Sequence, residues 1–212
     1  MLGDLPPVIV IDHFLGGVVA ERLLQYAIIR ESGFRPSKVA LKHESIIDES
    51  RRVSKVNSDT DGAIPLIEPA IRKAVDEAIP KLGLVNVESY FLEPELTWCG
   101  DGSFFKTHVD TLYRDRSANQ RVMTVVYYFY KEPKAFTGGQ LRLYGLGADA
   151  NSPSRQEIEP QLDRAVLFPA WFPHEVLPVH CSSAAFADGR FAISCWVRKS
   201  FGGDQHYGNQ RH

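Results

Sequence analysis

Cysteine is scarce in this chain of 212 residues: there are three, Cys99, Cys181 and Cys195, at spacings that suggest no pairing. An odd, widely spaced set argues against a disulfide framework and favours reduced thiols, so we expect a cytoplasmic protein. Long apolar runs are also missing, and no stretch approaches the length that crosses a bilayer. The opening stretch MLGDLPPVIVIDHFLGG contains no Lys or Arg, so we expect no secretory signal.

Neither sign of charge dominates the sequence. It has 24 Lys and Arg against 26 Asp and Glu, a formal net charge of −2. Such a balance gives no reason to expect a nucleic-acid or membrane partner. Hydrophobic residues, in contrast, make up 44% of the chain, which is enough to bury a sizeable core in one domain.

The first 89 residues predict a helical support region. GVVAERLLQYAIIRE, residues 17–31, has apolar residues at helical spacing. A second helix is expected over PAIRKAVDEAI, with Pro69 in its first turn and Pro80 just past its end. Between them, SRRVSKVNSDTDGA, residues 50–63, is polar and predicts a loop.

From about Tyr90 the pattern changes to short β-strands rich in β-branched and aromatic residues, separated by Gly, Pro, Asp or Ser. The segments are LTWCG, FFKTHVD, RVMTVVYYFY, GGQLRLYG, RQEIEP, RAVLFP, HEVLPV and RFAISCWVRK. They predict a mainly β protein with flanking helices: a jelly roll of two four-stranded sheets, with the helices packed on one outer face. We expect one domain over residues 1–212, in which 90–200 form the core and 201–212 a tail.

The segment GSFFKTHVDTLY places His108 and Asp110 two positions apart, so in a strand both side chains would point to the same face. A third residue of this kind, His174, opens the alternating stretch HEVLPV. Two His and one carboxylate are the ingredients of a facial triad that holds Fe(II) and leaves coordination positions open. The alternative is a surface or hydrogen-bonded pair at His108 and Asp110, together with an unrelated core histidine.

Arg190 begins a strand that is otherwise apolar on both faces. A buried guanidinium is costly without a partner, and arginine is well suited to bind a carboxylate through two hydrogen bonds. The alternatives are that Arg190 reaches solvent or pairs with Asp188 or Asp163.

Together these stretches resemble the Fe(II)- and 2-oxoglutarate-dependent dioxygenases, specifically the prolyl 4-hydroxylase-like branch, over about residues 90 to 200. The matching stretches are THVD, RVMTVVYYFY, TGGQLRLYG, IEPQLDRAVLFP, PHEVLPV and GRFAISCWV. The resemblance implies that His108, Asp110 and His174 bind Fe(II). It also implies that Arg190 binds the distal carboxylate of 2-oxoglutarate.

Two aromatic residues gain a role from the same resemblance. Tyr128 falls where the family often has a tyrosine whose hydroxyl reaches the distal carboxylate; the alternative is a plain core tyrosine. Trp196 matches a tryptophan that lines the substrate side in some relatives, and a core or rim aromatic is its alternative. The chain departs from the family at Trp98 and Phe105, where related prolyl hydroxylases often have tyrosines, so we expect two hydroxyls to be missing from the pocket.

The reaction that the resemblance implies is hydroxylation of an unactivated C–H bond by O2, with 2-oxoglutarate converted to succinate and CO2 and with ascorbate as a candidate reductant. Halogenating relatives replace the carboxylate ligand by a small residue, so Asp110 predicts hydroxylation. The substrate stays open between a prolyl residue of a peptide or protein, a free amino acid and another small or carrier-tethered metabolite. Arg114 and Arg116, in TLYRDRSANQR, would lie on a lid at the mouth and meet an acidic group, or else on a solvated loop.

Two other classes remain open at this point. One is a non-catalytic jelly-roll module that binds a metal or ligand. The other is a cupin-type metal enzyme without 2-oxoglutarate, although cupins usually bring more histidines than are found around His108. The oligomeric state is not predicted.

Overall fold

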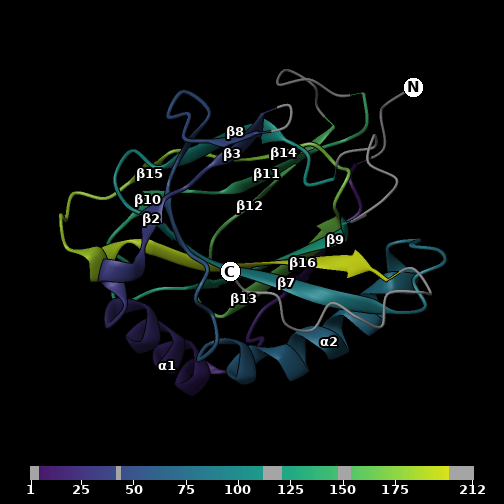
Figure 1. Ribbon diagram of the computed structural model, residues 1–212, viewed down its shortest axis with the longest axis horizontal. Helices are drawn as coiled ribbons and strands as arrows, with labels where there is room; N and C mark the ends of the chain where they lie inside the picture. The colour runs from purple at the N-terminus through teal and green to yellow at the C-terminus, as the bar shows by residue number, and fades with distance from the viewer. Residues whose placement is uncertain (1–4, 42–43, 112–120, 148–153, 201–212) are drawn as a thin grey trace.

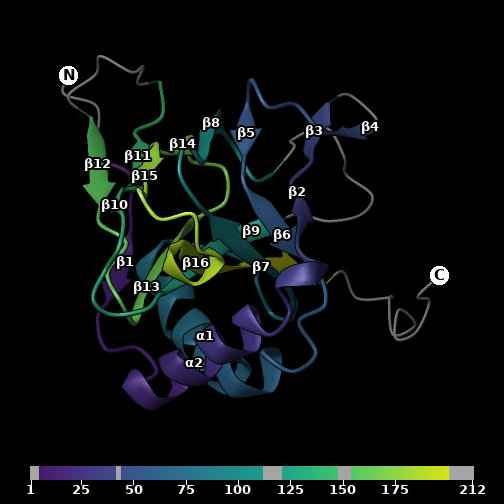
Figure 2. The same cartoon turned by 90° about the vertical axis from the view of Figure 1, so that its left-hand side faces the viewer.

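The computed structural model describes residues 5–41, 44–111, 121–147 and 154–200. Two β-sheets face each other, and two helices cover the outer face of the larger sheet (Figures 1 and 2). This layering confirms the predicted jelly roll with helices on one outer face. Among the described residues, no helix has both the length and the apolar character needed to cross a bilayer.

The larger sheet has seven strands in the order β1-β13-β9-β16-β7-β6-β2. Their bounds are β1 Ile9–Ile11, β2 Arg35–Pro36, β6 Lys55–Asn57, β7 Tyr90–Cys99, β9 Arg121–Phe129, β13 Arg164–Pro169 and β16 Arg190–Lys199. The smaller sheet has five strands in the order β12-β11-β14-β8-β5. These are β5 Arg52–Val53, β8 Phe104–His108, β11 Leu141–Tyr144, β12 Arg155–Ile158 and β14 His174–Val176.

Two further pairs and two 3-10 turns complete the described elements. The pairs are β3 (Val39–Leu41) with β4 (Glu44–Ile46), and β10 (Thr137–Gly138) with β15 (Val179–His180). The 3-10 turns are η1 (Glu31–Gly33) and η2 (Phe186–Asp188). The predicted count of four strands in each sheet was therefore wrong. Residues 50–63, predicted as a loop, contribute β5 to the edge of the smaller sheet and β6, between β7 and β2, to the larger one. Such short polar strands add backbone pairing without an apolar pattern in the sequence.

The long central strands separate two environments by simple alternation. On β16, Phe191, Ile193, Cys195 and Val197 are buried against the helices, while the residues between them face the space between the sheets. β9 alternates in the same way. One face of the larger sheet therefore makes the main core, and the other face makes a wall of the inter-sheet cavity.

Helices α1 (Gly17–Ile28) and α2 (Ile64–Lys81) close the core from outside. α2 begins five residues before the predicted start, so Pro69 lies inside it. A proline within a helix costs about 3 kcal/mol. Here the helix continues because its first turns bury Ile67 and Ile71 completely against the sheet, and burial of one such side chain contributes roughly 1.5–3 kcal/mol.

A buried carboxylate joins the start of α1 to the sheet. Asp163 accepts hydrogen bonds at 2.8 Å from the backbone N–H groups of Leu15 and of Gly16, and at 2.9 Å from the hydroxyl of Tyr127. Unpaired N–H groups at the first turn of a helix need such acceptors. Asp163 is thus fully engaged on the helix side of the larger sheet.

Candidate metal centre and anion pocket

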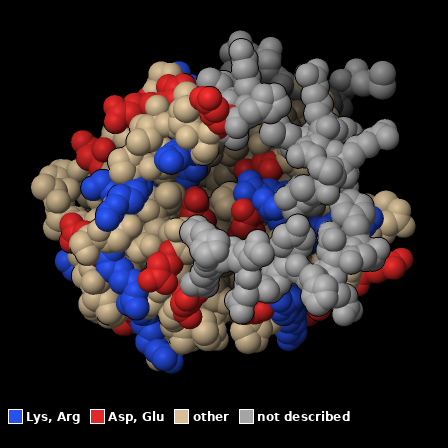
Figure 3. Space-filling model, in the orientation of Figure 1, with Lys and Arg blue, Asp and Glu red and all other residues tan. Residues whose placement is uncertain are grey.

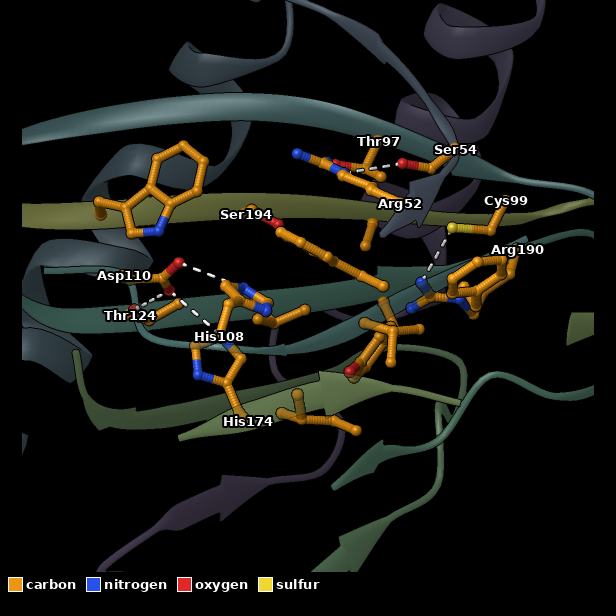
Figure 4. A pocket seen from close by; sticks show the side chains of 18 residues that line it. Arg52, Ser54, Thr97, Cys99, His108, Asp110, Thr124, His174, Arg190 and Ser194 are labelled. Atoms are coloured by element: carbon orange, nitrogen blue, oxygen red, sulfur yellow. Dashed lines mark hydrogen bonds and ion pairs between the residues drawn. The ribbon is translucent and has the colours of Figure 1, made fainter. Parts of the chain in front are cut away.

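Three potential metal ligands meet at one point of the inter-sheet cavity. His108 ends β8, His174 begins β14, and the two residues are direct partners in the antiparallel ladder. Nε2 of His108 lies 3.6 Å from Oδ1 of Asp110, and Nε2 of His174 lies 3.4 Å from Oδ2 (Figure 4). One ligand atom from each of the three residues lies within 4.8 Å of the others, as a shared metal ion would require.

Hydrogen bonds around the group fix how each ligand is presented. The Nδ1 of His108 lies 2.9 Å from the carbonyl of Lys106, and the Nδ1 of His174 lies 2.9 Å from the carbonyl of Phe172. A carbonyl can only accept, so each ring carries a proton on Nδ1 and turns its other nitrogen, Nε2, toward the centre. This outer support is typical of metal-binding histidines.

The Asp110 carboxylate has outer support of its own, from β9. Thr124 donates its hydroxyl proton to Oδ2 at 2.7 Å. The backbone N–H of Asp110 donates to the carbonyl of Ala170 at 3.0 Å.

The electrostatics of the group favour an ionised carboxylate. Burial alone would raise the pKa of the Asp110 carboxyl, but the facing imidazoles of His174 and His108 hold that pKa well below its usual range. Burial and the neighbouring His174 lower the pKa of the His108 ring. For His174, burial is outweighed by Asp110, which raises its pKa. Metal ligands must be deprotonated, and a carboxylate with a neutral imidazole is the form that a cation needs.

Aromatic rings hold both imidazoles in place. Phe105 stacks on His108 with centroids 3.6 Å apart, and Phe168 meets His174 edge-on at 4.8 Å. Phe105 also lines the cavity. It therefore lies at a pocket position without a hydroxyl, in agreement with the sequence interpretation.

Arg190 lies at another part of the same cavity and is buried, with 3% of its surface exposed. Its Nη2 donates to the sulfur of Cys99 at 3.1 Å, while its Nε has no hydrogen-bond partner in the described part of the chain. Neither predicted carboxylate partner pairs with it: Asp163 is bound near α1, and Asp188 pairs with Lys131 at 3.0 Å. Those alternatives, and exposure to solvent, were wrong.

Tyr128 lies beside this arginine. It is buried, lines the cavity, and its ring centroid is 5.3 Å from the guanidinium carbon of Arg190. Tyr127 points to the opposite face, toward Asp163. Burial raises the pKa of the Tyr128 hydroxyl to about 12, so this group remains a neutral donor across the physiological pH range.

The expectation that Trp98 stands at a pocket position was wrong. Its indole stacks on Phe186 with centroids 5.0 Å apart and donates to the Phe186 carbonyl at 2.8 Å. Because neighbours on a strand point to opposite faces, the cavity positions of β7 belong to Thr97 and Cys99. The stretch LTWCG has no apolar alternation strong enough to reveal which residues face inward.

The Gly-Gly pair of TGGQLRLYG has a steric explanation at this site. Gly138 and Gly139 both have φ of +72°. A Cβ on Gly138 would lie 2.1 Å from the carbonyl oxygen of Pro178, and one on Gly139 would lie 3.1 Å from Cδ of Arg190. Side chains are thus excluded where the chain passes the arginine.

One wall of the cavity carries an aromatic ring flanked by charges. Trp196 lines the cavity, and its buried Nε1 has no partner among the described residues. The guanidinium of Arg121 lies 3.8 Å above the indole and pairs with Glu93, which also accepts from Arg198 at 2.6 Å. The two arginines predicted for a lid, Arg114 and Arg116, lie outside the described residues.

Among the cavity residues that sequence reasoning missed is Arg52 of β5. Its guanidinium lies 4.8 Å over the Phe105 ring and pairs with Glu95 at 3.3 Å. It was missed because its segment resembles a solvated loop.

In the space-filling view a hollow between the sheets has both acidic and basic side chains around it (Figure 3).

Comparisons with known proteins agree with this geometry. Residues 94–198 match the profile of the 2OG-Fe(II) oxygenase superfamily. A relative from Synechocystis sp. (strain ATCC 27184 / PCC 6803 / Kazusa), the uncharacterized PKHD-type hydroxylase sll0191, is 36% identical over 144 residues, which are 64% of this chain and 47% of that relative. This chain thus spans about half the length of that protein.

Two solved structures share the fold. A Pseudomonas putida prolyl-4-hydroxylase superposes with a TM-score of 0.66 at 21% identity, over 92% of this chain and 94% of that one. A Trichoplax adhaerens prolyl hydroxylase, solved with a peptide fragment of the hypoxia inducible factor oxygen degradation domain, has a TM-score of 0.67 at 24% identity, over 91% and 83%. At these identities the likeness concerns the fold.

Proposed function

This chain belongs to the 2OG-Fe(II) oxygenase superfamily, and from that premise we propose that it hydroxylates an unactivated C–H bond of a prolyl residue in a peptide. The observation that carries the proposal is the pairing of two sites in one cavity. A His-Asp-His group lies at one place, and a buried arginine without a carboxylate partner among the described residues lies at another.

The residues fit the two groups that such a reaction needs. His108, Asp110 and His174 would hold Fe(II), because imidazole and carboxylate in a set of three suit that ion and leave positions open. Arg190 and Tyr128 would hold the distal carboxylate of 2-oxoglutarate, since an unpaired guanidinium needs an anion. When bound together, iron and 2-oxoglutarate supply the activation of O2 that oxidises the substrate and releases succinate and CO2.

The protein's own residues supply orientation and a dry environment. Thr124 fixes one carboxylate oxygen of Asp110, so that residue keeps its place among the ligands. Phe105 and Phe168 cover the imidazoles and exclude water from that side. Because the ligand position carries Asp110 rather than a small residue, we infer hydroxylation and not halogenation.

A peptide substrate is favoured by the residues that line the cavity. Apolar side chains such as Val126 and Val176 could pack against a pyrrolidine ring, and Trp196 offers an N–H that has no described partner. Arg52 adds hydrogen-bond donors on the same side. Apolar faces beside donors suit a prolyl ring flanked by peptide carbonyls. Both superposed structures are named as prolyl hydroxylases, which supports the same substrate class.

The test is succinate release by the purified protein, loaded anaerobically with Fe(II) and 2-oxoglutarate and then given O2. Proline-containing peptides and free amino acids would be compared as substrates, with mass spectrometry of the products. Faster succinate release with a peptide that gains one oxygen atom supports the proposal. Stimulation by a free amino acid alone would replace the peptide by a small-molecule substrate. Failure to bind Fe(II) and 2-oxoglutarate would leave a non-catalytic module.

A further inference from the structure

One thiol of the chain belongs to the anion pocket. Cys99 ends β7 directly opposite Arg190 in the ladder with β16, and its sulfur accepts a hydrogen bond from the Nη2 of that arginine at 3.1 Å (Figure 4). Cys99 lines the cavity although only 3% of its surface is exposed. Any group that enlarges this sulfur therefore enters the space around the guanidinium.

A second observation indicates that this space is built for a ligand. In the described part of the chain, three buried side-chain atoms have no hydrogen-bond partner: Oγ1 of Thr97, Nε of Arg190 and Nε1 of Trp196. All three residues line the cavity that Cys99 lines. Unpaired buried polar atoms are rare. The Nε of Arg190 is the one that lies beside Cys99, so an occupant of this part of the cavity would complete its hydrogen bonds.

The other two cysteines have different surroundings. The sulfur of Cys181 faces the backbone carbonyls of Ser183 and Asp188 at 3.6 Å, and Cys181 packs in one hydrophobic cluster with Cys99 without lining the cavity. Cys195 lies in the core against the helices, where burial raises the pKa of its thiol to about 12. Neither lines this cavity, so the chain carries its own internal controls for thiol reactivity.

We propose that Cys99 is an oxidation site that controls the binding of 2-oxoglutarate. The inference rests on the proposed function, because it assigns 2-oxoglutarate to Arg190. The reduced thiol is a weak acceptor and leaves the arginine available for an anion. A sulfenic acid would place an oxygen atom next to the guanidinium, occupying its donors and part of the space for the carboxylate. Oxidation of Cys99 therefore weakens the binding of 2-oxoglutarate, and bound 2-oxoglutarate hinders the oxidation.

The oxidation step is balanced with hydrogen peroxide as the co-reactant. The sulfur attacks one peroxide oxygen, the O–O bond breaks, and an S–O bond forms. The thiol loses two electrons and becomes Cys–SOH, while the second peroxide oxygen takes up the thiol proton and leaves as water. Excess dithiothreitol reverses the change, because sulfenic acids condense with thiols and are then reduced.

The experiment uses the full chain loaded with Mn(II), because Fe(II) would itself react with peroxide. The protein is treated with hydrogen peroxide, with and without 2-oxoglutarate, in the presence of dimedone, which traps sulfenic acids. Mass spectrometry then reports the adduct at each cysteine. Calorimetry reports the Kd for 2-oxoglutarate before oxidation, after oxidation without dimedone, and after dithiothreitol.

We expect the adduct on Cys99 in the absence of 2-oxoglutarate and protection when it is bound. Oxidation should weaken 2-oxoglutarate binding about tenfold or more, a change of about 1.4 kcal/mol, and dithiothreitol should restore it. Cys181→Ser should keep this sensitivity to peroxide. In Cys99→Ala, whatever affinity remains should not change with peroxide.

Different results separate the two proposals. If the untreated protein does not bind 2-oxoglutarate, the proposed function fails and the thiol inference falls with it. If it binds, but peroxide leaves the Kd unchanged or labels all three cysteines equally, only the thiol inference is overturned. An equal loss of affinity on oxidation of Cys99→Ala would also overturn it, since another residue would then be responsible.

Discussion

His174 lies directly opposite His108 in the ladder between β14 and β8, with the two ring centroids 4.2 Å apart. Residues far apart in the sequence are thus brought together by strand pairing alone, and the backbone hydrogen bonds of the smaller sheet set their spacing. A centre placed by a ladder is held more rigidly than one placed by loops. The relative placement of the two histidines should therefore exist before any ion binds, while Asp110, just beyond the end of β8, is held by Thr124.

The first prediction concerns the metal. Replacing His174 by alanine removes one of three ligands, so the affinity for Fe(II) should fall by about a hundredfold or more. Loss of a hydrogen-bond partner behind a ligand costs less, about 10–100-fold. His180→Ala is the matched control, because His180 is exposed and pairs with Thr137 on a separate two-stranded sheet. Anaerobic titration with Fe(II) measures both variants. Equal affinities in the two would show that the group does not hold the ion.

The second prediction separates function from stability at Arg190. A buried cation without a carboxylate partner lowers the stability of the ligand-free protein. Replacing buried charge by a well-packed apolar residue often stabilises a protein by about 1–4 kcal/mol. Arg190→Met should therefore raise the free energy of unfolding without ligand and abolish the stabilisation by 2-oxoglutarate. Urea denaturation with and without 2-oxoglutarate measures both effects.

The control for that prediction is Arg142→Met on the outer face of the smaller sheet. Arg142 already pairs with Glu157 at 2.8 Å and with Glu175 at 2.9 Å, so its loss should not stabilise the protein and should leave the ligand effect intact. A marked destabilisation by Arg190→Met would mean that the arginine is satisfied within the protein, and the anion assignment would lose its basis.

Strand alternation explains how much of the site could be predicted from sequence. Period two placed His108 and Asp110 on one face, whereas the cavity roles of Tyr128, Arg190 and Trp196 came from the family resemblance. The three metal ligands needed only residue type and spacing, together with a family resemblance.

What could not be predicted depends on contacts between segments. Arg52 reaches the cavity because the short strand β5 adds to the edge of the smaller sheet, and its pairing leaves no apolar pattern in SRRVSKVNSDTDGA. Cys99 faces Arg190 through a strand register that is set across a long separation in sequence. Helix α2 starts earlier than predicted because Ile67 is buried in the tertiary structure. This burial outweighs the low helix propensity of Pro69.

The third prediction uses two glycines with the same backbone strain. Gly139 and Gly147 have φ of +72° and +79°, so alanine at either position should cost about 1–2 kcal/mol of stability. A Cβ at Gly147 meets nothing within 4 Å, whereas one at Gly139 would press on Arg190 and Val179. Only Gly139→Ala should also weaken 2-oxoglutarate binding, by about tenfold. Thermal unfolding measures the stability of both variants, and calorimetry measures their Kd for 2-oxoglutarate. If the Kd changed equally in both variants, the binding site would not lie beside Gly139.

The fourth prediction concerns the attachment of α1. Asp163→Ala leaves the N–H groups of Leu15 and Gly16 and the Tyr127 hydroxyl without their acceptor, so the protein should lose about 3–5 kcal/mol of stability. Tyr127→Phe removes one of these bonds and should cost about 1 kcal/mol. Chemical denaturation measures the difference. Similar losses in the two variants would mean that the helix start does not depend on this carboxylate.

The last prediction follows from the neutral hydroxyl of Tyr128. Burial raises its pKa to about 12, against 10 for an ordinary tyrosine. Below pH 10 both the folded and the unfolded states keep the proton, and stability is unaffected. Between pH 10 and 12 the unfolded state ionises first, so stability should fall as pH rises, by about 2–3 kcal/mol through this residue. Tyr128→Phe should remove that part of the loss when its unfolding is compared with wild type at pH 9 and pH 11.

The same variant tests the role of the hydroxyl in the pocket. If it donates to the distal carboxylate of 2-oxoglutarate, Tyr128→Phe should weaken binding about threefold to tenfold, the effect of one net hydrogen bond. The loss of affinity for 2-oxoglutarate should be equal at pH 7 and pH 9, because the Tyr128 hydroxyl is protonated at both. Tyr144→Phe is the control, since that hydroxyl bonds to Glu175 outside the cavity. An unchanged Kd in Tyr128→Phe would reduce Tyr128 to a core residue, with Arg190 left as the anion's partner.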